Sequence, residues 1–255
     1  MRINPKKSLG QNFLADKNIV KKIIEALSLS PSDTVLEIGS GKGEITSLIA
    51  SRVYKVYALE LDARLKDILE ERLKGYDNAR VIIQDILKLD LAKLLAPKEK
   101  IKVFGNIPYY ISSPIIEYLI RHRGRIERAF ITVQKEFAKR VVASPGSKDY
   151  GSLSFFVQYY CLPEIIFHIN RGCFYPVPKV DSSLLSLAFR AQPAVYVKDE
   201  ELLFRLIRSA FNQRRKTLRN SLKGIAETGE IGAFLNQRPE DLSLEDFANL
   251  ANRIS

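Results

Sequence analysis

The sequence predicts an α/β domain with a mostly parallel sheet over residues 1–190, followed by a small all-helical domain over residues 191–255. In the first part, apolar segments typical of strands alternate with amphipathic segments typical of helices, which is the pattern of βαβ units. A glycine-rich turn follows the first apolar strand, as in Rossmann-like folds that bind nucleotides. Beyond Pro193 only helical patterns remain, which places the domain boundary near residue 190.

The expected elements begin with a helix whose N-cap is Asp16 and whose apolar stripe runs from Ile19 to Leu27 at helical spacing. Strands are predicted at residues 34–38, 55–59, 80–84, 101–104, 128–133 and 182–189. Helical segments are expected between these strands, including residues 134–142. In the C-terminal part, helices are predicted at residues 200–222, 231–235 and 244–254.

Composition narrows the class of protein. The 255 residues are 46% hydrophobic, which is enough for a normal packed core. Two cysteines and two histidines are too few for a disulfide framework, a zinc cluster or histidine-based catalysis, so we expect no metal. The start, Met1 to Leu14, lacks the apolar segment of a signal peptide, and no apolar run is long enough to cross a bilayer. We therefore expect a cytoplasmic protein. We also expect it to be a monomer.

The charge of the chain points to a polyanionic partner. Its net charge is +11, and seven basic residues with no acid lie between Arg205 and Lys223. Five of these cations recur at helical spacing: Arg205, Arg208, Arg215, Arg219 and Lys223. A merely solvated helix face would normally mix in acids one turn away, and none occur here. The stripe therefore predicts contact with RNA phosphates.

The segment Asn106-Ile107-Pro108-Tyr109 combines groups suited to methylating the exocyclic amine of a base. Such an amine is a poor nucleophile because its lone pair is delocalised into the ring. A side-chain oxygen from Asn106 and the carbonyl of Ile107 can accept the amine hydrogens, while Tyr109 offers a flat face for stacking. Pro108 restricts the turn. The alternative is an ordinary turn with an asparagine near a proline, which is common.

A second set of residues predicts a nucleoside-containing cofactor. Gly39 and Gly41 let the backbone approach the ligand, and Glu60, which ends the next strand, can bind both ribose hydroxyls. Asp85 follows the third strand, where it can accept a hydrogen bond from an adenine amine. Acids, including Glu37 before the glycine turn, suit S-adenosylmethionine, which carries an ammonium group and no phosphates. The alternatives are an NAD site and acids that are only solvated strand ends.

Six motifs in the same order resemble the ribosomal RNA adenine N6,N6-dimethyltransferases, and they cover about residues 6 to 223. The motifs are Gly10 to Leu14, Leu36 to Gly43, Asn106 to Ser112, Gln134 to Glu136, Phe174 to Ser182 and Ala210 to Leu218. One departure is Ser40, where the family usually has proline, and a small serine fits the turn. The last two motifs resemble most closely the bacterial small-subunit branch, which is linked to kasugamycin sensitivity.

This resemblance implies a function for individual residues. It implies that Asn12 and Leu14 close over S-adenosylmethionine, that Gly39 and Gly41 make room for its methionine part, and that Glu60 binds its ribose. Asp85 and Ile86 would hold the adenine. Asn106 would span the cofactor and the target amine, with Tyr109 and Phe174 as two aromatic walls around the target base.

The branch implies dimethylation of two adjacent adenosines near the 3′ end of small-subunit ribosomal RNA, during late subunit biogenesis. Two rivals remain open at this point. One is a large-subunit methyltransferase of the erythromycin-resistance type, and the other is an assembly factor that binds immature small subunits, with methylation secondary. An NAD-dependent oxidoreductase fits less well, because the chain offers no candidate proton donor and such an enzyme does not explain the basic stripe.

Overall fold

The computed structural model describes residues 4–255, so the first three residues of the Met1–Leu14 segment lie outside the described part. Contacts divide the chain into two compact units. The first contains the described residues up to Ala138 together with Glu164–Phe189, and the second contains Lys139–Pro163 and Arg190–Ser255. The sequence suggests a change near residue 190 but not the inclusion of Lys139–Pro163 in the second unit.

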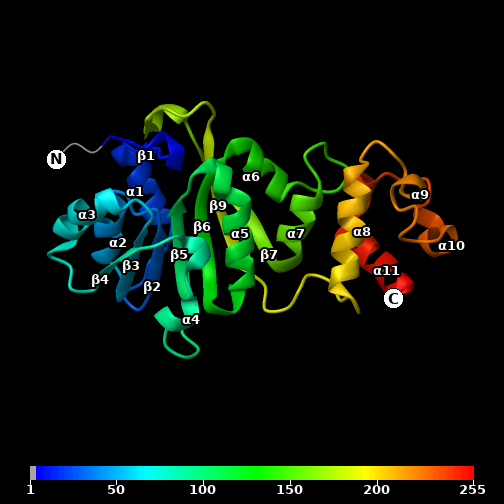
Figure 1. Ribbon diagram of the computed structural model, residues 1–255, viewed down its shortest axis with the longest axis horizontal. Helices are drawn as coiled ribbons and strands as arrows, with labels where there is room; N and C mark the ends of the chain where they lie inside the picture. Colours follow the sequence, from blue (N-terminus) through cyan, green and yellow to red (C-terminus); the bar gives the residue numbers. More distant parts are fainter. Residues whose placement is uncertain (1–3) are drawn as a thin grey trace. The chain divides into compact units, whose positions relative to one another are not determined.

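A seven-stranded sheet forms the centre of the first unit, in the order β4-β3-β2-β5-β6-β9-β7 (Figure 1). The strands are β2 Thr34–Ile38, β3 Lys55–Glu60, β4 Ala79–Ile83, β5 Ile101–Asn106, β6 Ile126–Gln134, β7 Cys161–Ile169 and β9 Ser182–Phe189. From β4 to β6 all neighbours are parallel, and β9 pairs antiparallel with β6. The mostly parallel α/β sheet predicted from the sequence is confirmed.

Helices of the first unit follow the predicted alternation. They are α1 Lys17–Ala26, α2 Glu44–Ala50, α3 Lys66–Leu73, α4 Leu91–Leu94, α5 Ser112–Arg121 and α6 Lys135–Val142, the last of which crosses into the second unit. Asp16 caps α1 as predicted, because its side chain accepts hydrogen bonds from the backbone N–H groups of Asn18 and Ile19. Contacts of α2 with β3, of α3 with β4 and of α5 with β6 cover the sheet.

The N-terminal arm, defined here as residues 4–15, is tied to the first unit by a two-stranded sheet. Its strand β1 (Phe13–Leu14) pairs antiparallel with β8 (Phe174–Tyr175). Leu14 and Phe174 are buried in the same apolar cluster as Ile23 and Ile24 of α1. The pairing therefore anchors the arm next to the sheet through apolar packing as well as backbone hydrogen bonds.

The second unit has an aromatic core built by three helices, α7 (Ser152–Tyr160), α8 (Glu200–Asn212) and α11 (Leu244–Ile254). The rings of Phe155 and Phe247 meet edge to face with centroids 5.0 Å apart, and Phe211 lies 5.5 Å from Phe155. Such aromatic pairs stabilise a core beyond the effect of the area that they bury. This packing explains why α7 belongs with the C-terminal helices although it precedes two strands of the sheet.

Two features of the C-terminal part differ from the sequence-based prediction. The helix expected over residues 200–222 ends at Asn212, and a separate short helix, α9, covers Leu218–Ser221. At this break the backbone N–H groups of Leu218 and Arg219 bond to the carbonyls of Gln237 and Leu235, so tertiary hydrogen bonds replace the helical ones. The predicted helix at residues 231–235 is α10 (Thr228–Ile231) followed by a 3₁₀ turn.

The sequence also missed β7 and α7. Strand β7 lies at the edge of the sheet, contains Pro163 and lacks a regular alternation of buried and exposed residues. Proline is tolerated at sheet edges, where its missing N–H leaves no ladder bond unmade. The pattern of this segment therefore gave no strand signal.

Within residues 4–255, no helix is long and apolar enough to cross a membrane. The same residues contain no cluster of three or more histidine, cysteine or acidic side chains placed to hold a metal ion.

Replacing Phe247 with alanine should lower the free energy of unfolding by about 3–5 kcal/mol, because it leaves a cavity at the centre of the aromatic core. The exposed Tyr196→Ala variant is the control, and it should change stability by less than about 0.5 kcal/mol. Urea unfolding followed by circular dichroism measures both. Equal stability of the two variants would contradict this account of the second unit.

Candidate active site

The carboxyl ends of four parallel strands bring most of the predicted site residues to one edge of the sheet. The glycine turn follows β2, Glu60 ends β3, Asp85 follows β4, and Asn106 ends β5. Because the strands are parallel and in register, these positions lie at the same edge, where open α/β folds bind ligands. Two cavities open here, and Gly39 and Asn106 line both.

The first cavity, called here the nucleoside cavity, collects most of the predicted residues. They are Asn12, Gly39, Glu60, Asp85, Ile86, Asn106, Ile107, Pro108 and Tyr109. The second, called here the large cavity, is lined by Leu14, Gly39, Gly41, Asn106 and the buried Glu37, among others. The structure therefore brings together every predicted cofactor residue and all of the predicted catalytic residues except Phe174.

Glu60 links the turn after β2 to the loop after β3 through three hydrogen bonds. Its Oε2 accepts the N–H of Gly41 at 2.8 Å, and its Oε1 accepts those of Leu61 and Asp62 at 2.9 and 2.8 Å. Burial raises the pKa of Glu60, and the three backbone donors oppose that rise. A carboxylate has about four acceptor positions, so at least one remains for a ligand hydroxyl.

Gly39 and Gly41 of the glycine turn both adopt a backbone conformation that favours glycine. Gly39 and Gly41 have φ angles of +76° and +58°, which side chains rarely adopt. A Cβ atom on Gly41 would also stand 3.1 Å from the ring of Phe13 in the arm. Between them, Ser40 is buried, and its hydroxyl lies 3.4 Å from the carbonyls of Glu37 and Leu59. The serine that departs from the usual proline is thus accommodated.

Asn106 is held at both ends of its side-chain amide. Its Nδ2 donates to the backbone carbonyl of Asn12 in the arm at 2.8 Å, and its Oδ1 accepts the hydroxyl of Thr132 at 2.6 Å. Because a carbonyl only accepts, the NH₂ group must face the arm and the oxygen must face Thr132. One lone pair of Oδ1 and one N–H remain for a ligand.

The side chain of Tyr109 is likewise held by a hydrogen bond to a residue of another strand. Its hydroxyl lies 2.7 Å from the hydroxyl of the fully buried Ser182, at the start of β9. Burial raises the pKa of Tyr109, so the hydroxyl stays protonated at neutral pH. This contact fixes the direction of the ring, which lines the nucleoside cavity.

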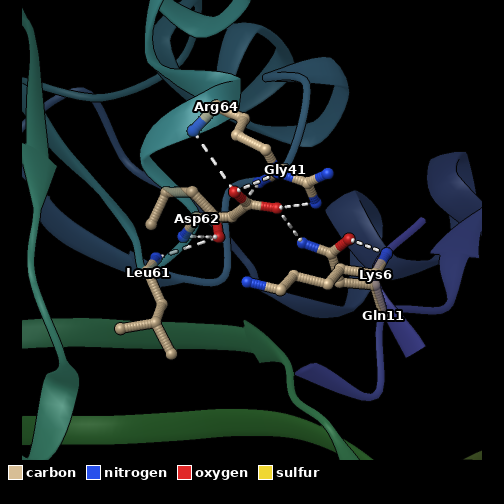
Figure 2. Close-up of polar contacts among 7 residues, drawn as sticks. Lys6, Gln11, Gly41, Leu61, Asp62 and Arg64 are labelled. Carbon is tan, nitrogen blue, oxygen red and sulfur yellow. Dashed lines mark hydrogen bonds and ion pairs between the residues drawn. The ribbon is translucent and has the colours of Figure 1, made fainter. Parts of the chain in front are cut away.

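A polar network ties the arm to the loop after β3 (Figure 2). Gln11 Nε2 donates to Asp62 Oδ2 at 3.0 Å, and Gln11 Oε1 accepts the N–H of Lys6 at 2.8 Å. Arg64 donates from Nε to Asp62 Oδ1 at 2.8 Å and from Nη2 to Oδ2 at 2.5 Å, and it lowers the pKa of Asp62 to about 2. The arm therefore closes one side of the nucleoside cavity through a hydrogen bond to an acid that stays ionised.

The structure places Phe174 away from the expected position. Only 2% of this residue is exposed, and it packs in the apolar cluster with Leu14 instead of lining either cavity. The pairing of β8 with β1 explains the difference, because neighbouring residues of a strand point to opposite faces. Tyr175, next in the strand, is 64% exposed and lines the large cavity.

The predicted RNA-binding cations are all exposed, but they do not share one helix. Arg205 and Arg208 lie on α8, Arg219 lies on α9, and Arg215 and Lys223 lie in the turns around α9. The expectation of a single helical stripe is therefore wrong beyond Asn212. The helix ends there because backbone N–H groups after the break bond to carbonyls of a distant segment.

Sequence reasoning did not assign functions to four residues that shape this site. Gln11 falls within the motif from Gly10 to Leu14, and Asp62 lies two residues after Glu60, but no pattern showed that their side chains are in contact. Ser182 ends the motif that begins at Phe174, whereas Thr132 lies in no motif. Their contacts gave no signal, because they cross between strands that are distant in the sequence.

Comparison with known proteins supplies the family. The family described as ribosomal RNA adenine dimethylase matches residues 2–255. The chain belongs to this family. It is 43% identical over 256 residues to "Ribosomal RNA small subunit methyltransferase A" of Clostridium botulinum, which covers 97% of this chain and 93% of that protein. The protein of the same name from Moorella thermoacetica is 44% identical over 266 residues, covering 98% and 92%.

Two solved structures of methyl-transferring enzymes share the fold. A dimethyladenosine transferase from Plasmodium falciparum has a TM-score of 0.80 and 29% identity, covering 93% of this chain and 95% of that chain. The 23S rRNA methyltransferase ErmE has a TM-score of 0.75 and 28% identity, covering 95% and 99%. The predicted family and the predicted fold of a methyltransferase domain with C-terminal helices are thus confirmed.

The residues present fit S-adenosylmethionine, the cofactor of this family. Glu37 lines the large cavity, and its Oε2 is buried with no hydrogen-bond partner among the described residues. A buried acceptor without a partner is costly, and a cationic group placed beside it removes that cost. An ammonium group therefore suits the large cavity, and the acceptors on Glu60 and Asp85 suit a nucleoside in the other.

The buried Glu37 should make stability depend on pH. Burial, with a smaller contribution from the Glu60 charge, raises its pKa from 4.5 to about 8, so the folded protein binds a proton that the unfolded chain releases. This stabilisation is complete below pH 4.5 and is lost as the pH rises through about 8. Between about pH 6 and pH 9, the Tm of the wild type should fall several degrees more than that of Glu37→Gln.

Differential scanning calorimetry without added cofactor measures this difference. Glu127→Gln, which alters an exposed acid on β6, is the matched control and should keep the pH dependence of the wild type. Parallel Tm curves for Glu37→Gln and the wild type would show that Glu37 does not titrate as described.

Proposed function

We propose that this protein transfers methyl groups from S-adenosylmethionine to the N6 amines of two adjacent adenosines near the 3′ end of small-subunit ribosomal RNA, late in subunit assembly. The observation that carries the chemistry is the Asn106 amide, held between the arm and β6 at the point where both cavities meet. The choice of the small subunit is supported by the relatives at 43% and 44% identity, which carry that substrate in their names.

S-adenosylmethionine supplies a methyl group on a positively charged sulfur, which is already a good leaving group. The protein therefore needs to position the acceptor amine more than to activate it with a strong base. Asn106 Oδ1 and the Ile107 carbonyl accept the amine hydrogens and localise its lone pair, while the ring of Tyr109 holds the base flat. Methyl transfer leaves a positive charge on the nitrogen, and this methylated ammonium is acidic and readily loses a proton to solvent.

Reaching this site requires an adenosine outside the base stack, because the amine of a paired base is not accessible. With Phe174 in the core, the wall opposite Tyr109 is not supplied by Phe174 in this structure. We propose that RNA binding is supported by the exposed cations Arg205, Arg208, Arg215, Arg219 and Lys223 of the second unit. These cations contact phosphates, so they contribute affinity more than sequence choice.

The proposed function also implies where the enzyme works and in which oligomeric state. Small ribosomal subunits of bacteria are assembled in the cytoplasm, so we expect the protein to work there. One chain contains both a complete set of cofactor residues and the exposed cations, so we propose that it acts as a monomer.

The large-subunit alternative is kept open by the likeness to ErmE at 28% identity. The assembly-factor alternative predicts tight subunit binding that survives loss of the Asn106 side chain. The first alternative predicts methylated large-subunit RNA, and the second predicts that subunit binding does not need Asn106. A methyl-transfer assay combined with subunit binding therefore separates the three hypotheses.

Replacing Asn106 with alanine should lower methyl transfer about 100-fold or more, because it removes the side-chain acceptor of the amine hydrogens. The assay supplies labelled S-adenosylmethionine to unmodified small subunits, large subunits and naked ribosomal RNA, and identifies the modified nucleosides by mass spectrometry. Asn18→Ala, an exposed asparagine on α1, is the control and should retain full activity.

The leading proposal expects N6,N6-dimethyladenosine on small subunits only. Label on large-subunit RNA would instead support the resistance type. No transfer by the wild type, combined with tight binding to small subunits, would leave an assembly factor.

The double change Arg205→Gln and Arg208→Gln should weaken binding to small subunits and reduce the slope of log K against log salt by about 1 to 2, since each cation neutralises one phosphate. Filter binding at several salt concentrations measures both values. Lys74→Gln, an exposed cation at the C-cap of α3, should change neither the affinity nor the slope. An unchanged slope in the double variant would remove these two arginines from the RNA contact.

A further inference from the structure

The fully buried Thr132 of β6 stands beside Asn106 in the register of the two parallel strands. Its hydroxyl lies 2.6 Å from Asn106 Oδ1 and 3.5 Å from the carbonyl of Gly105. A hydroxyl has one proton, so the short contact identifies Asn106 as the group that receives it. No sequence motif points to this threonine, and the function proposed above leaves it unassigned.

The terminal torsion of asparagine is broad, so its amide does not choose one orientation by itself. Two contacts choose it here, one from Asn12 in the arm and one from Thr132 in the sheet. The arm is anchored to the rest of its unit by a two-residue strand pair, the buried Leu14 and a few polar contacts, whereas Thr132 lies in a nine-residue strand paired on both sides. The contact from Thr132 is therefore the one fixed by the rigid part of the fold.

We propose that Thr132 is a positioning residue for methyl transfer, which fixes the side-chain oxygen of Asn106 so that its remaining lone pair meets the acceptor amine. This inference rests on the proposed function of Asn106. The hydroxyl leaves one of the two lone pairs of Oδ1 free, and it holds the amide plane in one direction before the base arrives. A positioned group of this kind affects the rate more than the binding of either substrate.

Thr132→Val keeps the shape of the side chain and removes the hydroxyl, so the rate of methyl transfer in a single turnover should fall about 10- to 100-fold. The dissociation constants for S-adenosylmethionine and for small subunits should stay within about 2-fold, because the hydroxyl contacts neither. Thr132→Ser restores the hydroxyl and should recover the rate to within about 3-fold of the wild type.

Thr34→Val is a matched control on strand β2, which lies on the other side of β5 from β6. Thr34 is also buried, and its hydroxyl donates to Glu99 Oε1 at 2.8 Å, but it lies at the opposite end of the strand from the site. This variant should lose stability in the same way as Thr132→Val and transfer methyl groups at the wild-type rate. It separates a loss of positioning from a general loss of stability.

A second readout does not depend on activity. In ¹H–¹⁵N spectra, the side-chain NH₂ signals of Asn106, assigned by their absence in Asn106→Ala, should shift in Thr132→Val and return in Thr132→Ser. A wild-type rate in a folded Thr132→Val protein would overturn the inference, as would a Thr132→Ser variant as slow as the valine variant. If the wild type itself transfers no methyl group, the proposed function fails, whereas the NMR comparison still tests the contact.

Discussion

The carboxylate of Glu60 is the interaction on which the rest of the site depends. It joins the glycine turn after β2 to the loop after β3 through three backbone N–H groups, and it is almost completely buried. Removing it would leave three backbone donors without partners, and the two buried ones, on Gly41 and Asp62, would each cost about 1–3 kcal/mol. The loop that it holds also carries Asp62, to which the arm is attached through Gln11. The position of the arm over the nucleoside cavity therefore depends on the same carboxylate.

A second acid, Glu37, lies near the end of the neighbouring strand β2, but its carboxylate has fewer hydrogen-bond donors than that of Glu60. Glu60 has three donors for its charge, whereas one oxygen of Glu37 has no partner among the described residues, and burial raises its pKa to about 8. The backbone donors thus oppose the effect of burial on the pKa of Glu60, while Glu37 stays mostly protonated until a cation reaches it. Two carboxylates at one strand edge can in this way serve different parts of one cofactor, the ribose and the ammonium group.

The side chains proposed to be catalytic are oriented by residues of the sheet. Asn106 and Tyr109 lie at the end of β5 and just beyond it, but the hydroxyls that orient them come from β6 and β9. These strands are buried and paired on both sides, so their side chains have little freedom. Polar groups on rigid elements hold reacting geometry better than groups on loops. The second unit is built differently, from an aromatic core that leaves its cations exposed.

The sequence by itself determined the α/β fold, the order of the parallel strands' motifs and most of the residues that meet at their carboxyl ends. These follow from local patterns: periodicity, a glycine turn, and acids at strand ends. Tertiary structure alone decided that Phe174 enters the core, that the helix from Glu200 stops at Asn212, and that Thr132 and Ser182 orient the catalytic side chains. Each of these outcomes depends on hydrogen bonds or packing between segments distant in the chain, and local propensity contains no information about such partners.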